Sequence, residues 1–407
     1  MGQKQIVFIL ICSIMLIIIP SISSSLYQRQ RIFVEPTASN ASVRSTIRNV
    51  IETSDIMNDT KMYFQQLRRN SEEFFPTWAY KNTSKTLKSF AGQNGSRGIV
   101  VCVGNGYFLL SLVALEALRS VGNKLPVEVV FSTSSDLSLT NQQILVSRFP
   151  EVQLVDLSTI FDHSYLSLRG FAIKPFSVLA SRFQHVLLMD ADAMFLEQPS
   201  TLFENELYVR TGSLFFYERF VVSIDCRRLL ARMATITKNI IPRRAQDSGV
   251  VVIDKGRVLL GLLGICKLNE RDQREKFTYK SMYGDKDTWW VGFQLVGTEY
   301  SFMPTLTGAI GQVRFKKVCG HILHFDQNDK PIWWNGGTFK NRYVNMHEIL
   351  QIEGWLEEGE WSGNIYSCVS NSKRLPKLFM EPHRSLIENY INITKQIFNI
   401  SARTNVA

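Results

Sequence analysis

The stretch Val186-Leu-Leu-Met-Asp-Ala-Asp192 is an apolar run that ends in two aspartates separated by one small residue. A short apolar run that stops at polar residues is typical of a buried strand. At the end of such a strand Asp190 and Asp192 can both turn toward one cation, and open α/β sheets bind ligands at the carboxyl ends of their strands. The run therefore predicts a strand that carries two carboxylates to a ligand site.

Strand and helix patterns alternate on both sides of this run. The expected strands are Ile99–Val103, Val127–Phe131, Val152–Val155, Val186–Met189, Val250–Ile253 and Ile322–Phe325. The expected helices extend from Gly106 to Leu118, begin after Thr140, open at Pro175 and extend from about Asp287 to Val296. Alternation of this kind predicts an α/β fold with a single mixed, largely parallel sheet flanked by helices.

Composition divides the chain into five segments. Residues 6–22 are almost all apolar and uncharged, which is long enough for a transmembrane signal anchor behind a cytoplasmic tail of residues 1–5. A cleaved signal peptide is the alternative, because serines follow the apolar run, and the flanking charges do not decide the orientation. Residues 23–97 indicate a polar lumenal stem, residues 98–375 one folded domain, and residues 376–407 a loosely docked C-terminal tail.

Composition also excludes two classes of protein. The chain has 407 residues, of which 45% are hydrophobic and 20% charged, so most of it is globular rather than disordered. The net charge of +10 is spread over short pairs such as Arg243-Arg244, without zinc-finger spacing or a long basic tract. We therefore expect no nucleic acid partner.

Six Asn-x-Ser/Thr sequons flank the middle of the chain, which itself contains none. They begin at Asn40, Asn58, Asn82, Asn94, Asn392 and Asn399. Glycans need exposed backbone, so decorated flanks around an undecorated core are what a secretory-pathway protein would tolerate. This pattern favours a lumenal location for the folded body.

Five cysteines follow the apolar segment, and none of them has metal-ligand spacing. Cys102 lies inside an apolar strand pattern and is the best candidate for a buried free thiol. The other four allow three possible pairings, which the sequence does not distinguish. They are Cys226, Cys266, Cys319 and Cys368.

The two aspartates at the strand end suit a hard cation such as Mn²⁺ or Mg²⁺. An ion held by few protein ligands keeps positions for diphosphate oxygens. A loop cap is one alternative, and a phosphatase nucleophile is another, because aspartyl-phosphate enzymes also place Asp-x-Asp after an apolar strand. Met194 departs from that phosphatase pattern, as does the long α/β segment before Asp190.

A second polar group is His321-Ile-Leu-His324-Phe-Asp326, which Lys330-Pro331 follows. A histidine at a strand end can complete a metal site, and a lysine can meet a phosphate as a point charge. We therefore expect His324 to be a third metal ligand beside Asp190 and Asp192. A lone histidine with a purely structural role is the alternative.

From Gly98 to about Trp334 the sequence resembles the fungal α-1,3-mannosyltransferase family, glycosyltransferase family 71. The motifs that carry the resemblance are Gly98-Ile-Val-Val-Cys-Val-Gly-Asn, Lys174-Pro-Phe-Ser-Val-Leu, Val186-Leu-Leu-Met-Asp-Ala-Asp, Gln246-Asp-Ser-Gly-Val-Val-Val-Ile-Asp-Lys, Gly284-Asp-Lys-Asp-Thr-Trp-Trp and His324-Phe-Asp. The resemblance implies a GT-A catalytic domain in a single-pass type II Golgi membrane protein. It also implies a retaining mechanism, GDP-mannose as donor, manganese as metal, and protein-linked glycans of the cell wall as acceptors.

The spacing from His324 to Pro331 is similar to the His-x-x-Gly-x-x-Lys-Pro signature of the glycogenin-like family 8 enzymes. That resemblance implies that His324 is the third metal ligand and that Lys330 contacts the diphosphate. Gln327 replaces the glycine of the signature, which puts the conformation of this loop in doubt.

Three further residues are expected near the nucleotide. Gly104 and Asn105 end the first strand and would frame the nucleotide pocket. Lys174 precedes the strand that carries Asp190, and it would either face the diphosphate or cap a surface. The expected nucleotide-binding set is Gly104, Asn105, Lys174, Asp190, Asp285 and Lys330.

The carboxylates expected on the sugar side are Asp247, Asp285 and Asp287. Asp247 precedes Ser248-Gly249, where a glycine permits close approach to a sugar, although a turn residue is the alternative. By analogy with the family 8 Asp-Gln-Asp element, Asp285 or Asp287 would bond donor hydroxyls, although either suits a helix N-cap. Asp247 and Asp287 are the candidate catalytic carboxylates.

The leading hypothesis is mannosyl transfer from GDP-mannose to a mannose hydroxyl of a glycan acceptor. A lumenal glycosyltransferase with a UDP-hexose donor is the second hypothesis. The third is a lumenal carbohydrate-binding or scaffold protein that has lost turnover, which is less attractive because the proposed metal and phosphate residues are all present together.

Overall fold

The computed structural model describes residues 40–69, 87–233, 241–363 and 367–404. The expected cytoplasmic tail and signal anchor, residues 1–5 and 6–22, lie outside these ranges. Among the helices that are described, none combines the length and the apolar character needed to cross a bilayer.

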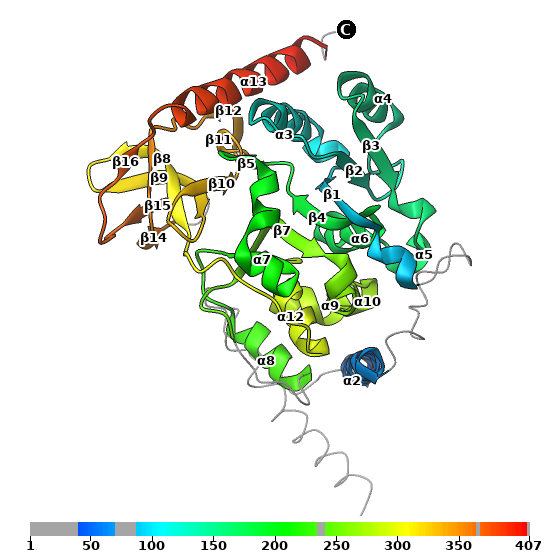
Figure 1. Cartoon of the computed structure of the whole chain (residues 1–407). Coiled ribbons are helices and arrows are strands. Elements are labelled where there is room, and N and C mark those ends of the chain that lie inside the picture. Colours follow the sequence, from blue (N-terminus) through cyan, green and yellow to red (C-terminus); the bar gives the residue numbers. More distant parts are fainter. Residues whose placement is uncertain (1–39, 70–86, 234–240, 364–366, 405–407) are drawn as a thin grey trace, which may run out of the picture. The chain divides into compact units, whose positions relative to one another are not determined.

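The first sheet has six strands in the order β3-β2-β1-β4-β7-β6. Neighbours among β1 to β4 run parallel, whereas β7 runs antiparallel to both β4 and β6. This topology confirms a mixed, largely parallel sheet with β4 near its centre (Figure 1). The strands are β1 (Gln93–Cys102), β2 (Val127–Phe131), β3 (Val152–Asp156), β4 (Phe183–Met189), β6 (Ser213–Tyr217) and β7 (Gln246–Asp254).

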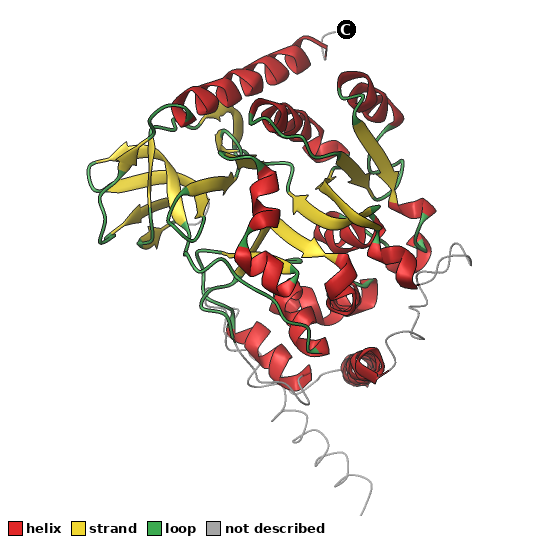
Figure 2. Cartoon of the chain, in the orientation of Figure 1, coloured by secondary structure: helices red, strands yellow, loops and turns green. Residues whose placement is uncertain are grey.

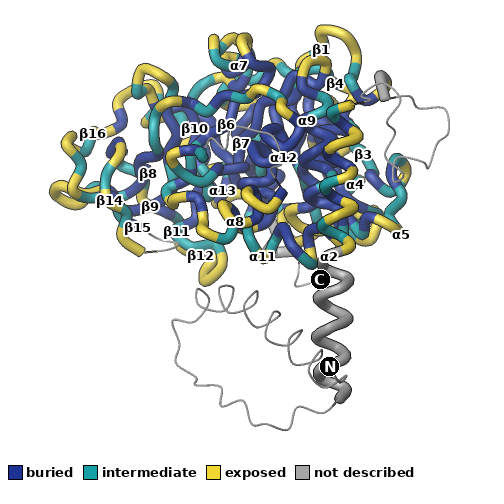
Figure 3. The backbone as a smooth tube through the Cα atoms, turned by 90° about the horizontal axis from the view of Figure 1, so that it is seen from below, coloured by how far each residue is buried: buried dark blue, intermediate teal, exposed yellow. Residues whose placement is uncertain are grey.

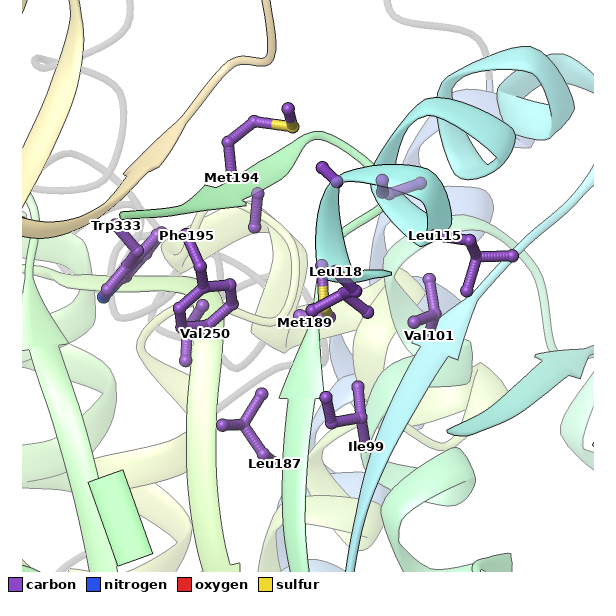
Figure 4. Packing of buried hydrophobic residues seen from close by; sticks show 14 of the residues in the cluster. Ile99, Val101, Leu115, Leu118, Leu187, Met189, Met194, Phe195, Val250 and Trp333 are labelled. Carbon is purple, nitrogen blue, oxygen red and sulfur yellow. The ribbon is translucent and has the colours of Figure 1, made fainter. Parts of the chain in front are cut away.

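Helices cover both faces of this sheet because alternate strand residues point to opposite sides (Figure 2). Leu187 and Met189 of β4 belong to one apolar cluster, and Val186 and Leu188 belong to the other. The covering helices are α3 (Phe108–Ser120) on the first side, and α6 (Ile173–Ala180), α9 (Lys255–Leu268) and α12 (Thr288–Val296) on the second. The side chains in Figure 4 that pack around β4 on the first side include Ile99, Val101, Leu115 and Leu118.

Burial of the central strands explains their sequences. β7 is buried along its whole length (Figure 3), and β4 is buried over its last four residues. A strand covered on both faces has no solvent side, so it carries a continuous apolar run rather than an alternating one. That is why Val186–Met189 could be recognised as a strand from the sequence.

A second sheet corrects the expectation of a single one. Eight antiparallel strands form it, and β9, which contains the expected strand Ile322–Phe325, belongs there. An apolar pattern predicts a strand but not its partner, so the sequence could not assign β9 to a separate sheet. The strands are β5 (Ala193–Phe195), β8 (Gly308–Arg314), β9 (Lys317–Phe325), β10 (Pro331–Asn335), β13 (Gly354–Leu356), β14 (Glu360–Ser362), β15 (Ser367–Ser370) and β16 (Lys377–Leu378).

The C-terminal residues form a helix that belongs to the core. Helix α13 (His383–Thr404) lies along α3 (Figure 1) and buries Ile387, Tyr390 and Ile397. The Tyr390 hydroxyl donates a hydrogen bond of 2.7 Å to the Phe195 carbonyl of β5. The expectation of a loosely docked tail was therefore wrong, because the amphipathic face of α13 closes the first apolar cluster.

The remaining helices are shorter or peripheral, apart from α2 (Asn40–Arg69). The chain divides into two compact units, residues 1–52 and 53–407, and α2 crosses their boundary. In the second unit, Thr60 donates to Gln273 and Arg68 donates to the Leu295 carbonyl, both at 2.7 Å. The others are α4 (Leu139–Arg148), α5 (His163–Leu166), α7 (Glu206–Thr211), α8 (Ile224–Met233), α10 (Arg271–Gln273) and α11 (Tyr279–Ser281).

One disulfide joins two strands of the second sheet. Cys319 of β9 and Cys368 of β15 are bonded, across a sequence separation of 49 residues. Cys102 is free, as expected, and so are the buried Cys226 and Cys266. Only one of the possible pairs among the four remaining cysteines therefore forms.

Candidate active site

The Asp190-Ala191-Asp192 segment lies where the two sheets meet. It connects β4 of the first sheet to β5 of the second. The Asp190 amide donates to the Gly249 carbonyl at 2.8 Å, and the amides of Gly336 and Gly337 donate to the Asp192 carbonyl. Backbone bonds from both sheets therefore hold the two aspartates at the carboxyl end of β4.

Each of these two carboxylates faces a cation. Lys174 Nζ lies 2.6 Å from Asp190 Oδ1, and the Arg342 guanidinium forms an ion pair with Asp192 Oδ2. The Lys174 side chain is only 8% exposed and also donates to the Ser248 carbonyl. Lys174 is therefore buried rather than a surface cap, and its direct partner in this structure is Asp190; the expected contact with a diphosphate stays a prediction.

The field around Lys174 and Asp190 is negative. Burial disfavours charge on Lys174, but the carboxylates of Asp190 and Asp285 outweigh it and raise the lysine pKa. Burial also raises the pKa of Asp190; Lys174 opposes this rise, whereas Asp285 and Asp247 add to it. We call Asp190, Asp192, Asp247 and Asp285 the acid cluster, which Lys174 and Arg342 neutralise only in part.

Asp247 and His324 form a buried pair. His324 Nε2 lies 3.0 Å from Asp247 Oδ2, and the His324 ring stacks on Trp333 with centroids 3.9 Å apart. The other carboxylate oxygen of Asp247 accepts from the Gly249 amide at 2.8 Å and from Asn335 Nδ2 at 3.0 Å. Burial alone would raise the pKa of Asp247, but the bond and charge of His324 lower it well below its usual range. Asp247 is therefore an ionised, rigidly oriented carboxylate.

Asp285 and Asp287 are held by the two tryptophans that follow them. Trp289 Nε1 donates to Asp285 at 2.8 Å, and Trp290 Nε1 donates to Asp287 at 2.7 Å. Both indoles are fully buried, which confirms that they pack in the core. Asp287 occupies the N-cap position of α12, but its side chain makes no capping bond. It accepts from the Gln246 amide at 3.1 Å instead, and burial raises its pKa.

Lys330 has a different environment from Lys174. Its side chain is 53% exposed, and its Nζ lies 2.6 Å from Glu197 Oε1. The Lys330 amide donates to Asp326 Oδ1 at 2.9 Å, so Asp326 orders the turn before β10. The structure therefore places Lys330 on an exposed loop, paired with Glu197 rather than with a member of the acid cluster.

Gly104 and Asn105 connect the end of β1 to the loop after β2. The Asn105 amide donates to the Asp136 carbonyl at 2.7 Å, and Asn105 Oδ1 accepts from the Ser138 amide at 2.9 Å. A β-carbon at Gly104 would lie 2.6 Å from Asp136 Oδ1, so a larger residue there would have to displace the Asp136 side chain. Both residues lie at the carboxyl edge of the first sheet, which is the edge that carries Asp190.

Three residues of this site were not recognised from the sequence. Arg342 follows β11 (Phe339–Asn341) and has no sequence signal that links it to Asp192. Asn335 precedes two glycines, a turn signal that could have marked a loop near the site. Glu218 is buried, and this burial is the main cause that raises its pKa. Lys286 Nζ, 3.9 Å from Glu218 Oε1, opposes the rise.

A divalent cation fits part of this arrangement. Asp192 Oδ2 is buried and faces only the Arg342 guanidinium among its described contacts, and the four carboxylates of the acid cluster outnumber the two cations, Lys174 and Arg342, that pair with Asp190 and Asp192. The expected third ligand, His324, is not free to bind an ion through Nε2, because Nε2 is hydrogen-bonded to Asp247 Oδ2. In the described part of the chain, no group of three or more His, Cys, Asp or Glu is arranged to hold an ion.

Comparison with known sequences places the chain in a family. Residues 96–239 and 231–328 match the Mannosyl_trans3 family, described as "Mannosyltransferase putative". This match covers more than half of the chain and includes Asp190, Asp192, Asp247 and His324. The chain belongs to this mannosyltransferase family. Membership confirms the resemblance deduced from the motifs and removes the support for a phosphatase.

Curated relatives in this family include two proteins of Saccharomyces cerevisiae. Alpha-1,3-mannosyltransferase MNN1 is 23% identical over 372 residues, covering 74% of this chain and 46% of MNN1. Alpha-1,3-mannosyltransferase MNT2 is 23% identical over 344 residues, covering 71% of this chain and 59% of MNT2. The chain thus spans about half the length of the curated relatives it matches.

Similarity to solved structures is weak. The galactosyltransferase LgtC, in complex with donor and acceptor sugar analogues, has a TM-score of 0.35 at 12% identity, covering 48% of this chain and 70% of LgtC. The S. cerevisiae mannosyltransferase Ktr4p in complex with GDP has a TM-score of 0.35 at 8% identity, covering 60% of this chain and 76% of Ktr4p. At these TM-scores the similarity defines neither the donor nor the metal of this chain.

Proposed function

We propose that this chain transfers mannose from GDP-mannose to a mannose hydroxyl of a protein-linked glycan, with retention and an α-1,3 linkage. The observation that carries the proposal is the pair of carboxylates, Asp190 and Asp192, at the end of β4 in a chain of a mannosyltransferase family. A GT-A type of fold is part of the proposal, because β4 delivers this pair to the carboxyl edge of a largely parallel sheet.

Asp190 and Asp192 would hold Mn²⁺ or Mg²⁺, with His324 as the third proposed ligand. When bound, the ion would supply positive charge to the departing diphosphate. The chain's own part is to supply hard oxygen ligands in a buried site, and the surplus negative charge of the acid cluster suits a divalent ion. Lys174 orients Asp190, and Lys330 is proposed to approach the diphosphate from the exposed loop.

Asp247 and Asp287 are the proposed catalytic carboxylates. Asp247 is ionised and fixed by His324 and Asn335, so it can stabilise positive charge that develops on the sugar without reorganising. Both oxygens of Asp247 already accept bonds, which favours electrostatic stabilisation over nucleophilic attack. Asp285 and Asp287, anchored by indole donors, would accept bonds from donor hydroxyls.

The proposed location is the Golgi membrane, in single-pass type II orientation with the folded domain in the lumen. The apolar residues 6–22 and the flanking sequons support this part of the proposal. Two measurements on the full chain test it. A glycan-removing enzyme should lower its apparent mass, and sealed vesicles should protect the folded domain from added protease. A chain without glycans that is degraded from the cytosolic side would contradict it.

The function is tested with the full chain in detergent. GDP-mannose, UDP-glucose and UDP-galactose are supplied in turn with α-mannoside acceptors, with Mn²⁺, with Mg²⁺ or with EDTA. We expect transfer from GDP-mannose that EDTA abolishes and that Asp192→Asn lowers at least a hundredfold. Asp272→Asn is the matched control, because its side chain is 58% exposed and pairs only with neighbouring Arg271 among its described contacts.

The outcomes separate the hypotheses. Transfer from a UDP-hexose alone would replace the donor and keep the site. Binding of a mannoside without any transfer would support a carbohydrate-binding protein. Wild-type-like transfer by Asp192→Asn would eliminate the proposed metal role.

A further inference from the structure

A short hairpin brings Arg342 to the acid cluster. Strands β11 (Phe339–Asn341) and β12 (Asn345–Ile349) form a two-stranded sheet of their own, with Arg342 at the turn. The Arg342 guanidinium pairs with Asp192 Oδ2, and its Nη2 donates to the Tyr343 hydroxyl at 2.8 Å. The side chain is 17% exposed and also lies over the ring of Tyr107, 5.8 Å from its centroid. Arg342 is thus a largely buried cation directly against the metal motif.

The donors of Arg342 are incompletely used. Its Nε atom is buried and has no hydrogen-bond partner within the described structure, whereas Nη1 is the atom that contacts Asp192 Oδ2, without hydrogen-bond geometry. The two groups therefore attract each other by charge but do not form the aligned bidentate bond that an arginine and a carboxylate can make. Buried unbonded donors are uncommon, and each calls for an explanation such as a bound water, ion or ligand.

Lys174 provides the contrast. It is at least as buried as Arg342, and its ammonium contacts Asp190, the Ser248 carbonyl and the Ser248 hydroxyl within 3.3 Å. Its hydrogen bonds go to Ser248 of β7, and its ion pairs go to Asp190 and Asp285. The Lys174 ammonium is therefore bonded within the site, whereas Arg342 keeps a buried Nε without a hydrogen-bond partner in the described structure.

The hairpin has an exposed tip and an anchored base. It follows Gly336 and Gly337, whose φ angles of 126° and 69° lie in the left-handed region that favours glycine. Its tip residues Tyr343 and Val344 are 65% and 79% exposed. Its base is anchored by buried Phe339, whose carbonyl lies 2.6 Å from His321 Nε2, and by buried Leu350, which follows β12. Movement of Arg342 away from Asp192 would therefore displace the exposed tip of the hairpin and leave its base in place.

We propose that Arg342 is a diphosphate-binding residue of the donor site and that, without a ligand, it occupies Asp192 in place of the divalent cation. This inference rests on the proposed function. A guanidinium recognises phosphate oxygens with two parallel bonds, which Nε and Nη1 of Arg342 could supply once Nη1 has left Asp192. When the cation takes Asp192, Arg342 is released toward the diphosphate that arrives with it.

The consequence is that the cation and the nucleoside diphosphate bind better together than apart. Bound alone, the cation must compete with Arg342 for Asp192. When the cation binds together with a diphosphate, it displaces Arg342 from Asp192, and Arg342 pairs with the diphosphate instead. Removing the arginine should therefore change the two affinities in opposite directions, which no purely structural role of the hairpin would do.

The test uses the full chain in detergent with Mn²⁺, GDP, UDP and GMP as probes. Mn²⁺ binding is followed by electron paramagnetic resonance, and nucleotide binding by calorimetry at saturating Mn²⁺. For Arg342→Ala we expect about threefold to tenfold tighter binding of Mn²⁺ alone and about tenfold weaker binding of GDP, with a smaller loss for GMP. Arg342→Lys should fall between wild type and Arg342→Ala for both probes, because it keeps the charge without the fork.

The matched control is Lys340→Ala, which removes an exposed ion pair with Glu348 from the same hairpin and leaves both affinities as in wild type. Equal weakening of Mn²⁺ and GDP by Arg342→Ala, with Arg342→Lys no better, would assign Arg342 a structural role and overturn the inference. Unchanged affinities in both variants would overturn it as well. If wild type binds Mn²⁺ together with GDP or UDP, and Arg342→Ala and Arg342→Lys bind both as wild type does, only the inference about Arg342 fails. If wild type binds neither nucleotide, the proposed function fails as well.

Discussion

His324 of β9 and Asp247 of β7 join the two sheets through a buried contact of 3.0 Å, although 77 residues separate them in the chain. Asn335 of β10 reaches the same carboxylate from a neighbouring strand of the second sheet. The site is therefore built across a sheet boundary.

Asp247→Asn should destabilise the fold in a manner that depends on pH. Because the folded pKa of Asp247 is lowered, its stabilisation is present above the unfolded pKa of about 3.9 and is lost as pH falls through the folded value. We expect a deficit of about 3 kcal/mol in the free energy of unfolding near pH 7, which narrows below about pH 4. Urea unfolding in EDTA, from pH 7 to pH 3, measures it. A deficit that stays constant over this range would indicate lost packing rather than lost charge.

Lys174→Met should cost about 3 kcal/mol, because it leaves the buried Asp285 and the partly exposed Asp190 without their cation. Adding Asp190→Asn should recover part of that loss, since it removes one of the two uncompensated charges. The free energies of unfolding of the two single variants and the double variant complete the cycle. Strict additivity would show that the 2.6 Å contact contributes nothing specific.

Lys330→Ala should leave stability within about 1 kcal/mol of wild type, because its ion pair with Glu197 is largely exposed. If Lys330 meets the diphosphate, as the family 8 signature implies, GDP affinity should fall about tenfold. Calorimetry measures this affinity, and Glu197→Gln is the control that removes the partner but keeps the lysine. A Lys330→Ala chain with wild-type GDP affinity would withdraw the role assigned by the signature.

Replacing both Cys319 and Cys368 by alanine should lower stability by about 4 kcal/mol, because the bond closes a loop of 49 residues in the unfolded chain. Thermal unfolding with and without a reducing agent measures the effect. Reduction should destabilise the wild-type chain and leave the double variant unchanged. A reducing agent that lowers the melting temperature of both would point to another bond.

Much of the first sheet could be predicted from local patterns. The Val186–Met189 run is buried on both faces, and burial on both faces produces the continuous apolar signal that identified β4. The same holds for β2, for β7 and for the buried part of β1, whereas β3 at the edge of the sheet is mostly only partly buried. The second sheet was not anticipated, because β9 looks like any other strand until its antiparallel neighbours are known.

The sequence by itself determined that Asp190 and Asp192 follow a buried strand, that Lys174 and Asp247 lie beside apolar segments of the same sheet, and that the motifs belong to one family. Only the tertiary structure decided which charges meet. Lys174 pairs with Asp190, Arg342 with Asp192, and His324 with Asp247. Local periodicity reports how a residue is buried, whereas an ion pair depends on where distant segments cross, and that depends on the packing of both sheets together.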